Sequence, residues 1–359
     1  MDAPNEEMVE EKQERGIVSE VVSGASKVVT SGISMIMPKR EYRYDLLVPE
    51  FLDCLGICAE EKKEGYVTIS SEQAKEFKDG LIEIAERLEM LISRYNLLEW
   101  AFLVHDWNRI HIFSDYAKEA GYQTTLVHGT LIAAGYEQYA RGICSLINKT
   151  TGKNLVYAGQ TIKFSEPSYT RRFKKSKINW LLENVVKKER GVDLSAVGIN
   201  LEKLRAITCP FTKLRESLES LSSDYITPFT VPSNVIERSN IEIKKGERDS
   251  AYRCLRKKPE EEVLMMHPAA FIISTVLNLS SRRTGSPEGE YRRMDLNFHN
   301  QPELGIFETM VRLSSPPKKL DGEKGTAYRY IFEALCIQND KPVVNGKVTC
   351  YSPHEIKLD

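Results

Sequence analysis

The chain has 359 residues, of which 41% are hydrophobic and 28% are charged, and its formal net charge is -1. This composition excludes a mostly disordered protein, and the length allows a sizeable core that we expect to divide into two lobes. The seven cysteines are scattered and follow no secretory signal, so we expect reduced thiols and a cytoplasmic location. The longest apolar runs are shorter than the roughly 20 residues of a transmembrane helix, so we expect no such segment.

Charge is distributed unevenly along the chain. Residues 1–100 contain 12 basic and 21 acidic side chains, whereas residues 161–260 contain 21 basic and 13 acidic ones. The basic middle is the part expected to face a polyanion. The acidic N-terminal part is an alternative partner for it, either within the molecule or between subunits.

Residues 1–40 are predicted to form a partly disordered N-terminal arm. A glutamate-rich start is followed by valines and isoleucines at near-helical spacing, but Gly24, Gly32 and the β-branched residues weaken a solitary helix. Three interpretations stay open. The arm docks on a neighbouring subunit, lies on a membrane surface as a helix that ends at Pro38, or remains a mobile tail.

The strongest helix signal of the N-terminal lobe, predicted over residues 41–150, begins at Ser70. Ser70 and Gln73 match a capping box, and apolar residues then recur at alternating steps of three and four up to Phe102. This spacing is typical of a coiled-coil seam or of a long helix in a bundle, and it favours packing within the molecule. The candidate oligomerisation residues of the seam are Phe77, Leu81, Ile84, Leu88 and Leu91.

Residues 151–285 are predicted to form a second, basic helical lobe. A small hairpin over residues 150–167 links the lobes, and the basic segment 171–190 then reads as a helix with an apolar stripe that contains Trp180. Residues 286–359 are predicted to be loop-rich. They end in a hairpin signalled by Asn345-Gly346 between β-branched residues. We find no internal repeat in the sequence.

The central basic residues satisfy the main physical requirement for binding RNA, since cations displace the counterions of phosphates. Aromatic residues beside them offer stacking surfaces, although Trp180 is expected in the core. A solvated basic face is the alternative interpretation. The candidate RNA-binding residues are Arg171, Arg172, Lys174, Lys175, Lys177, Lys187, Lys188, Arg253, Arg256, Lys257 and Lys258.

No compact catalytic, nucleotide-binding or metal-binding motif is found in the sequence. The phosphate-binding loop pattern fails around Gly152-Lys153, and Cys54 and Cys58 lack a second pair of zinc ligands. His105 and Asp106 with His111 offer an acid–base site, but no nucleophile accompanies them and the region is strongly apolar. Structural histidines are therefore expected, and neither a cofactor nor a metal is predicted.

The sequence thus predicts a mainly α-helical, two-lobed protein with minor β-hairpins and extended terminal arms. The predicted function is non-enzymatic binding of RNA by a self-associating cytoplasmic protein, as in a nucleoprotein or a viral replication factory. The alternative is a scaffold that assembles as a homo-oligomer through the heptad helix and the N-terminal arm, without nucleic acid. An enzyme without a compact motif is a third possibility.

Overall fold

A computed structural model describes residues 40–60, 64–170, 175–203, 205–216, 235, 237–246, 249, 252–255, 290–300, 302–322, 325–352 and 355–356. The N-terminal arm predicted for residues 1–40 therefore lies outside the described residues, except for Arg40, which begins the first helix. In the described part of the chain, no helix is both long enough and apolar enough to span a membrane.

The N-terminal part of the structure is helical. Its helices are α2 (Arg40–Cys54), α3 (Ser71–Arg87), α4 (Arg94–Val104), α5 (Arg109–Ile112), α6 (Ser114–Glu119) and α7 (Gly129–Thr151), and a 3-10 turn follows later at η2 (Tyr252–Cys254). Ser70 caps α3 with the predicted capping box, because its side chain accepts from the amide of Gln73 while the Gln73 side chain accepts from the Ser70 amide. A parallel pair, β1 (Ile57–Ala59) and β2 (Val67–Ile69), connects α2 to α3.

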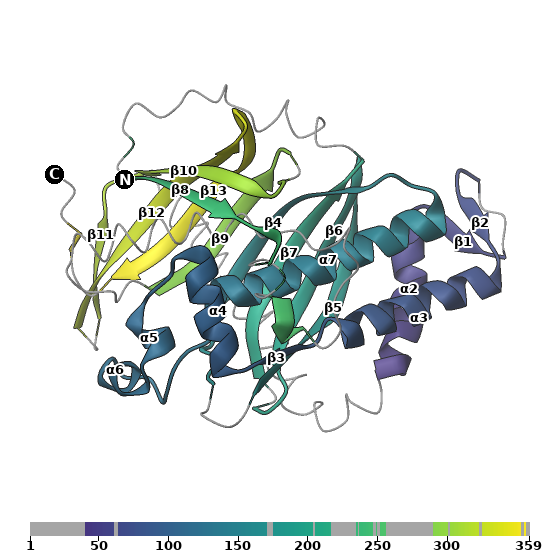
Figure 1. The fold of residues 1–359 in the computed structure, drawn as a ribbon. Helices are drawn as coiled ribbons and strands as arrows, with labels where there is room; N and C mark the ends of the chain where they lie inside the picture. Colours follow the sequence, from purple (N-terminus) through teal and green to yellow (C-terminus); the bar gives the residue numbers. More distant parts are fainter. Residues whose placement is uncertain are drawn as a thin grey trace, which may run out of the picture.

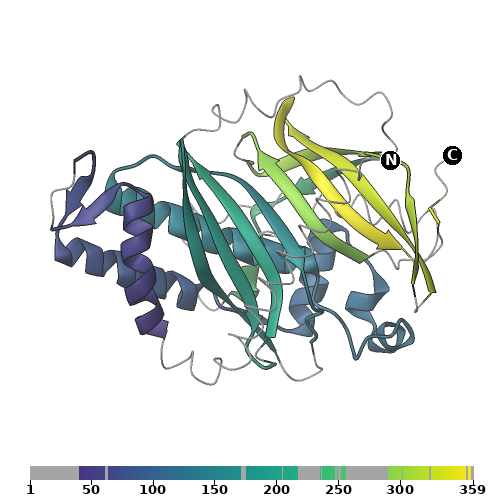
Figure 2. The ribbon, with the colours of Figure 1, turned by 180° about the vertical axis from the view of Figure 1, so that it is seen from behind.

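One large, predominantly antiparallel sheet forms the rest of the molecule. Its strands are β3 (Met90–Ile92), β4 (Val156–Phe164), β5 (Ser176–Lys188), β6 (Gly191–Asn200), β7 (Arg205–Arg215), β8 (Glu237–Ile243), β9 (Glu290–Phe298), β10 (Gly305–Leu313), β11 (Lys318–Gly322), β12 (Gly325–Gln338) and β13 (Lys341–Ser352). Helix α7 crosses one face of this sheet (Figure 1), and the opposite face is seen in Figure 2. Apolar residues of the helices and the sheet merge into one main core.

The sheet consists of two halves with the same strand order. The order is β3-β5-β6-β7-β4 in the first half and β8-β10-β12-β13-β9 in the second. Apart from β11, which pairs with β12 outside this path, each half follows the pattern 1-3-4-5-2 in its own sequence order. The halves join where β4 pairs with β9, from Gly159 opposite Asn297 to Lys163 opposite Arg293. The molecule therefore contains a topological repeat, although the sequence shows no internal repeat.

The prediction of a mainly α-helical protein is wrong, because strands of this sheet occupy most of the described residues after residue 155. The basic segment that reads as a helix is largely strand β5. In its central stretch β5 is buried on both faces, so its apolar residues run continuously and hide the two-residue period of a strand. Trp180 packs directly across β6, since a Cβ on Gly198 would lie 2.5 Å from the Trp180 ring.

The heptad helix is a core helix of this molecule. Phe77, Leu81 and Ile84 of α3 are buried in the main core, as is Leu88 at its C-cap, while Leu91 lies half-buried in β3. The sequence prediction of coiled-coil character is therefore wrong. The same apolar spacing serves packing of α3 against α2 and α7.

The predicted terminal hairpin exists, but its turn lies elsewhere. Strands β12 and β13 pair as neighbours, with Gln338 opposite Lys341. The turn residues Asn339 and Asp340 both have positive φ, as a tight hairpin turn requires. Asn345 and Gly346 lie inside β13, where the backbone of β9 approaches so closely that a Cβ on Gly346 would lie 2.1 Å from the Asp295 carbonyl oxygen.

Replacing Leu81 with alanine distinguishes a core helix from a dimer seam. Because Leu81 is 1% exposed, we expect Leu81→Ala to lower the free energy of unfolding by about 2–5 kcal/mol. The loss is expected to be the same at every protein concentration, whereas a dimer seam makes it concentration-dependent. Denaturant unfolding over a range of protein concentrations measures this, with Glu83→Ala on the exposed side of α3 as the control.

Candidate active site

A short extended loop after α4 places alternate side chains inside and outside the molecule. Helix α4 ends at His105, whose φ of 53° turns the chain away from the helix axis. From there Asp106, Asn108 and Ile110 are buried, while His105, Trp107 and Arg109 are exposed. Two successive hydrogen bonds hold the loop, since the Asn108 amide donates to Asp106 Oδ1 and Asn108 Oδ1 accepts from the Ile110 amide, both at 3.2 Å.

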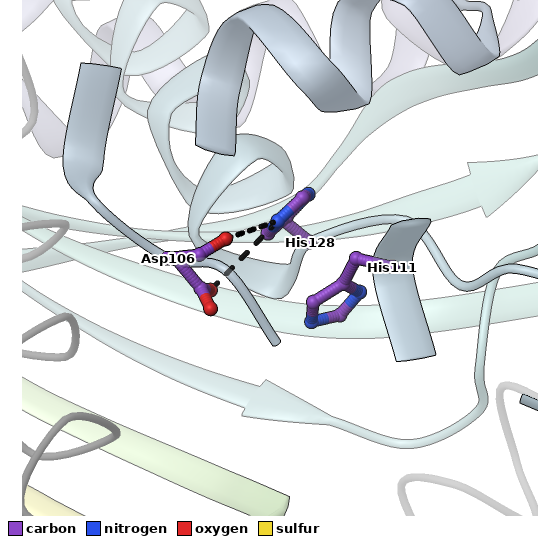
Figure 3. A group of neighbouring side chains, drawn as sticks. All are labelled: Asp106, His111 and His128. Carbon is purple, nitrogen blue, oxygen red and sulfur yellow. Dashed lines mark hydrogen bonds and ion pairs between the residues drawn. The ribbon is translucent and has the colours of Figure 1, made fainter. Parts of the chain in front are cut away.

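Asp106 meets two histidines at the inner side of this loop (Figure 3). The rings of His111, from α5, and His128, the N-cap of α7, stack with centroids 3.9 Å apart. His128 Nε2 lies 3.4 Å from the Asp106 carbonyl oxygen and 3.9 Å from Asp106 Oδ2. All three side chains are buried, and Oδ2 has no hydrogen-bond partner among the described residues.

The orientation of His111 follows from its hydrogen bond to the chain. Its Nδ1 lies 3.1 Å from the Leu126 carbonyl oxygen. Because a carbonyl oxygen only accepts hydrogen bonds, Nδ1 carries the proton in this contact. The other ring nitrogen, Nε2, therefore presents a lone pair as long as the imidazole is neutral.

Burial favours the neutral form of each group in the cluster. Burial raises the pKa of Asp106, and the neighbouring His111 opposes this shift. Burial lowers the pKa of His111, an effect that Asp106 opposes, and it lowers the pKa of His128 well below the ordinary value with a further contribution from His111. The proton affinities of carboxyl and imidazole thus approach each other, as an acid–base pair requires.

A cavity of about 140 Å³ opens beside the cluster. It is mostly apolar, and Gly129, the first residue of the 23-residue helix α7, lies in its wall. Amide N–H groups in the first turn of a helix lack intrahelical acceptors and point along the positive end of the helix dipole. The full lining is Asn108, Ile110, His111, Tyr122, Leu126, Val127, Gly129, Ile132, Phe164, Glu166, Pro167, Ser168 and Arg292.

The same three side chains carry donor atoms of the kinds that bind a metal ion. Asp106, His111 and His128 offer ligand atoms that lie within 4.8 Å of one another. However, the lone pair of an imidazole nitrogen lies in the plane of its ring, and the two rings are inclined by only 27°. Their lone pairs therefore run nearly parallel instead of converging on one point, so this arrangement fits proton transfer better than metal ligation.

The predicted RNA-binding cations do not form one track in the described part of the chain. Lys175 and Lys177 are exposed at the start of β5, and Lys187 and Lys188 at its end, about 33 Å away by the rise of a strand. Lys188 pairs with Asp193 at 3.4 Å, and Arg253 pairs with Glu99 at 3.3 Å. The candidates Arg171, Arg172, Lys174, Arg256, Lys257 and Lys258 lie outside the described residues.

Sequence analysis identified part of the cluster. Asp106 and His111 were recognised as a potential acid–base pair, but the expected outcome was structural histidines. The structure turns His105 outward and supplies His128 and Gly129 instead, which sequence reasoning missed. The signal lay in the two-residue alternation after α4 and in a histidine and glycine directly before a long apolar helix.

No protein-family model matches the chain, and no curated protein matches it by sequence. Solved structures do resemble it. A MaoC domain protein dehydratase from Chloroflexus aurantiacus aligns with a TM-score of 0.51 at 11% identity, over 74% of this chain and 93% of that one. A MaoC-like dehydratase gives a TM-score of 0.46 at 11% identity over 73% and 94%. A Mycobacterium tuberculosis protein described as a double hotdog fold gives 0.46 at 10% over 73% and 93%.

At this identity the first of these likenesses shows the fold alone, and the other two have TM-scores too low to support an argument. The described fold, two 1-3-4-5-2 half-sheets, is nevertheless unlike the predicted helical nucleoprotein. Together with the buried acid–base cluster, it overturns the predictions of a non-enzymatic RNA-binding protein, viral or otherwise. The alternative of an assembly scaffold likewise finds no support, because the predicted seam is core. Self-association itself stays a prediction.

The buried histidines predict a loss of stability in acid. Their pKa values in the folded protein lie below the ordinary 6.5, so the unfolded chain binds more protons as the pH falls through 6.5, and the free energy of unfolding decreases. Asp106, whose pKa is raised above 3.8, contributes in the opposite direction at lower pH. We expect His128→Asn to flatten the dependence just below pH 6.5 in denaturant unfolding. The exposed-site control His105→Asn is expected to leave it unchanged, and equal slopes in all three proteins contradict the assignment.

Proposed function

We propose that the chain is a hydro-lyase that reversibly eliminates water from a β-hydroxyacyl thioester. The observation that carries this proposal is that His111 lines one cavity with Gly129 at the start of α7, while the buried carboxyl of Asp106 lies within 4.8 Å of the histidine nitrogens, and burial shifts the pKa values of Asp106 and His111 in opposite directions. The likeness to a structure named as a MaoC domain protein dehydratase supports the same reaction class.

The geometry supports specific roles for the two groups. In the direction of elimination, Nε2 of neutral His111 takes the proton from the α-carbon, because Nδ1 is already bonded to the Leu126 carbonyl. Protonated Asp106, favoured by burial, donates its proton to the departing β-hydroxyl, so water leaves as the double bond forms. In the reverse direction the Asp106 carboxylate takes a proton from water as the water oxygen bonds to the β-carbon, and the His111 imidazolium protonates the α-carbon.

Negative charge develops on the carbonyl oxygen of the substrate when the α-proton leaves. The amide N–H of Gly129 at the start of α7 is placed to stabilise this oxygen, with the dipole of the long helix behind it. A thioester suits such a site because its α-proton is more acidic than that of an ester or a carboxylate. A neutral imidazole is then a sufficient base.

The dimensions of the site favour a small acyl group. The apolar cavity of about 140 Å³ is close to the roughly 150 Å³ that holds a benzene ring in a protein core. A second cavity of about 500 Å³, with polar and apolar walls in nearly equal parts, is lined by residues adjacent in sequence to those of the first, since Tyr122 and Ser168 line the first and Gln123 and Tyr169 the second. Its lining includes Lys118 and Lys203, which suits the polar end of a thioester carrier.

Substitution of the two acid–base residues tests the proposal. With crotonyl thioester in water, we expect hydration by the intact protein, seen as loss of the enoyl absorbance and formation of the 3-hydroxy product. Asp106→Asn and His111→Gln are each expected to lower kcat by about 10²- to 10⁴-fold, the usual contribution of a general acid or base.

His105→Gln is the matched control, because His105 adjoins Asp106 in sequence but faces outward. It is expected to keep the activity of the intact protein. Release of free thiol without a 3-hydroxy product indicates thioester hydrolysis and contradicts the proposed reaction. Full hydration activity in both Asp106→Asn and His111→Gln contradicts the proposed roles, provided that circular dichroism shows folded variants.

A further inference from the structure

Exposed aromatic side chains gather on and around the outer side of the loop that carries Asp106. Four exposed aromatic side chains lie between residues 95 and 113, namely Tyr95 (62% exposed), Phe102 (68%), Trp107 (45%) and Phe113 (53%). The other large hydrophobic side chains exposed in the described part of the chain are all aliphatic and lie elsewhere in the sequence, at Leu46, Val67, Val186, Leu304 and Ile306. Exposed aromatic residues are thus concentrated around one loop.

These aromatic residues belong to neighbouring elements. Tyr95 and Phe102 are seven residues apart on α4 and therefore lie on the same side of that helix. The rings of Phe102 and Trp107 meet edge to face with centroids 4.5 Å apart. Arg94 binds the start of α4 to α5 by donating to the Ile112 carbonyl at 2.8 Å, next to Phe113. We define the aromatic face as Tyr95, Phe102, Trp107 and Phe113 with the exposed cations Arg94 and Arg109.

In this region the basic side chains are exposed and the acidic side chains are not. The exposed basic side chains between residues 94 and 113 are Arg94, His105 and Arg109, whereas the two acids of the same stretch are turned inward. Glu99 is 12% exposed and pairs with Arg253, and Asp106 is buried in the active site. The aromatic face therefore presents cations without exposed carboxylates from residues 94–113, and Asp115, the next exposed acid in the sequence, pairs with Lys118 at 3.6 Å.

We propose that the aromatic face docks the protein on an anionic phospholipid surface. Tryptophan, tyrosine and phenylalanine favour the boundary between headgroups and acyl chains, and adjacent arginines are attracted by anionic lipids. A second copy of the chain is a poorer occupant, because a twofold contact through this face brings the arginines of both copies into one interface, to which the stretch 94–113 adds no exposed carboxylate. The acidic lipid surface supplies the complementary charge that the face itself lacks.

Docking in this way places the active site at the membrane surface. Trp107 stands between Asp106 and Asn108, so the loop that enters the headgroup region on one side holds Asp106, one member of the acid–base pair, on the other. An apolar substrate that partitions into the lipid then has a short path to the cavity. The inference about docking depends on the surface and is independent of the proposed reaction.

The chain contains a built-in reporter for the test. Of its three tryptophans, Trp100 and Trp180 are fully buried, so an environmental change sensed by tryptophan fluorescence on docking comes from Trp107. With vesicles of phosphatidylcholine and phosphatidylserine, we expect a blue shift of the emission and sedimentation of the full-length protein with the vesicles. Vesicles of phosphatidylcholine alone are expected to bind much more weakly, and added salt is expected to weaken both effects.

Paired variants locate the contact. Phe102→Ser with Trp107→Ser is expected to abolish sedimentation with the anionic vesicles, whereas the control Leu304→Ser with Ile306→Ser removes exposed aliphatic residues and leaves sedimentation unchanged. Arg109→Gln is expected to weaken binding roughly fivefold, the effect of one cation near an anionic surface. Circular dichroism verifies that each variant is folded.

Three results overturn the proposal. The first is an unchanged emission spectrum together with no sedimentation in anionic vesicles. The second is sedimentation of the Phe102→Ser and Trp107→Ser double variant equal to that of the intact protein, which places the lipid contact elsewhere. The third is a Trp107 blue shift that rises with protein concentration in the absence of vesicles, accompanied by a doubled mass, which shows that a second copy covers the face.

Discussion

The packing of α7 against the sheet is the contact on which the rest of the structure depends. Gly135 permits this packing, because a Cβ there would lie 2.3 Å from Sδ of Met90 in β3. Farther along the helix, Glu137 is fully buried and pairs with Arg141 at 2.8 Å, and burial raises the pKa of Glu137 to about 7. Such a pair tolerates little rotation of the helix, since losing either partner leaves a buried charge unmatched. The orientation of α7 in turn fixes where His128 and Gly129 stand.

The loop from His105 to Ile110 solves a second problem, which is how to place polar groups in an apolar environment. An extended segment points successive side chains in opposite directions, so a single loop serves the interior and the surface together. Inside, its hydrogen bonds hold Asp106 and Asn108 in place, and Asn108 caps the start of the short helix α5. Outside, the same backbone carries Trp107 and Arg109. A substitution of Asp106 or Asn108 therefore acts on the interior site, whereas a substitution of Trp107 or Arg109 acts on the surface.

The sequence predicted local features well and the sheet poorly, for physical reasons. The capping box at Ser70 depends on residues three apart, and it forms as predicted. Strand β5 depends on partners more than a few residues away, and its double burial removes the alternation that identifies a strand. In the site, Asp106 and His111 are close in sequence, and the sequence analysis named both. His128 joins them only because its ring stacks on that of His111, which is 17 positions away in the sequence. No local pattern specifies that contact.

The two halves of the sheet share a topology but differ in what they contribute to the site. In the first half, the chain between β3 and β4 supplies Asp106, His111 and His128. The corresponding sequence between β8 and β9, residues 244–289, contains one histidine, His267, and no aspartate followed by a histidine five positions later. The second half instead adds Arg292 of β9 to the wall of the cavity, because β9 pairs with β4 at the junction. Two halves that share a strand order, apart from β11, thus differ in chemistry, because the acid–base groups lie in one half and part of the enclosing wall lies in the other.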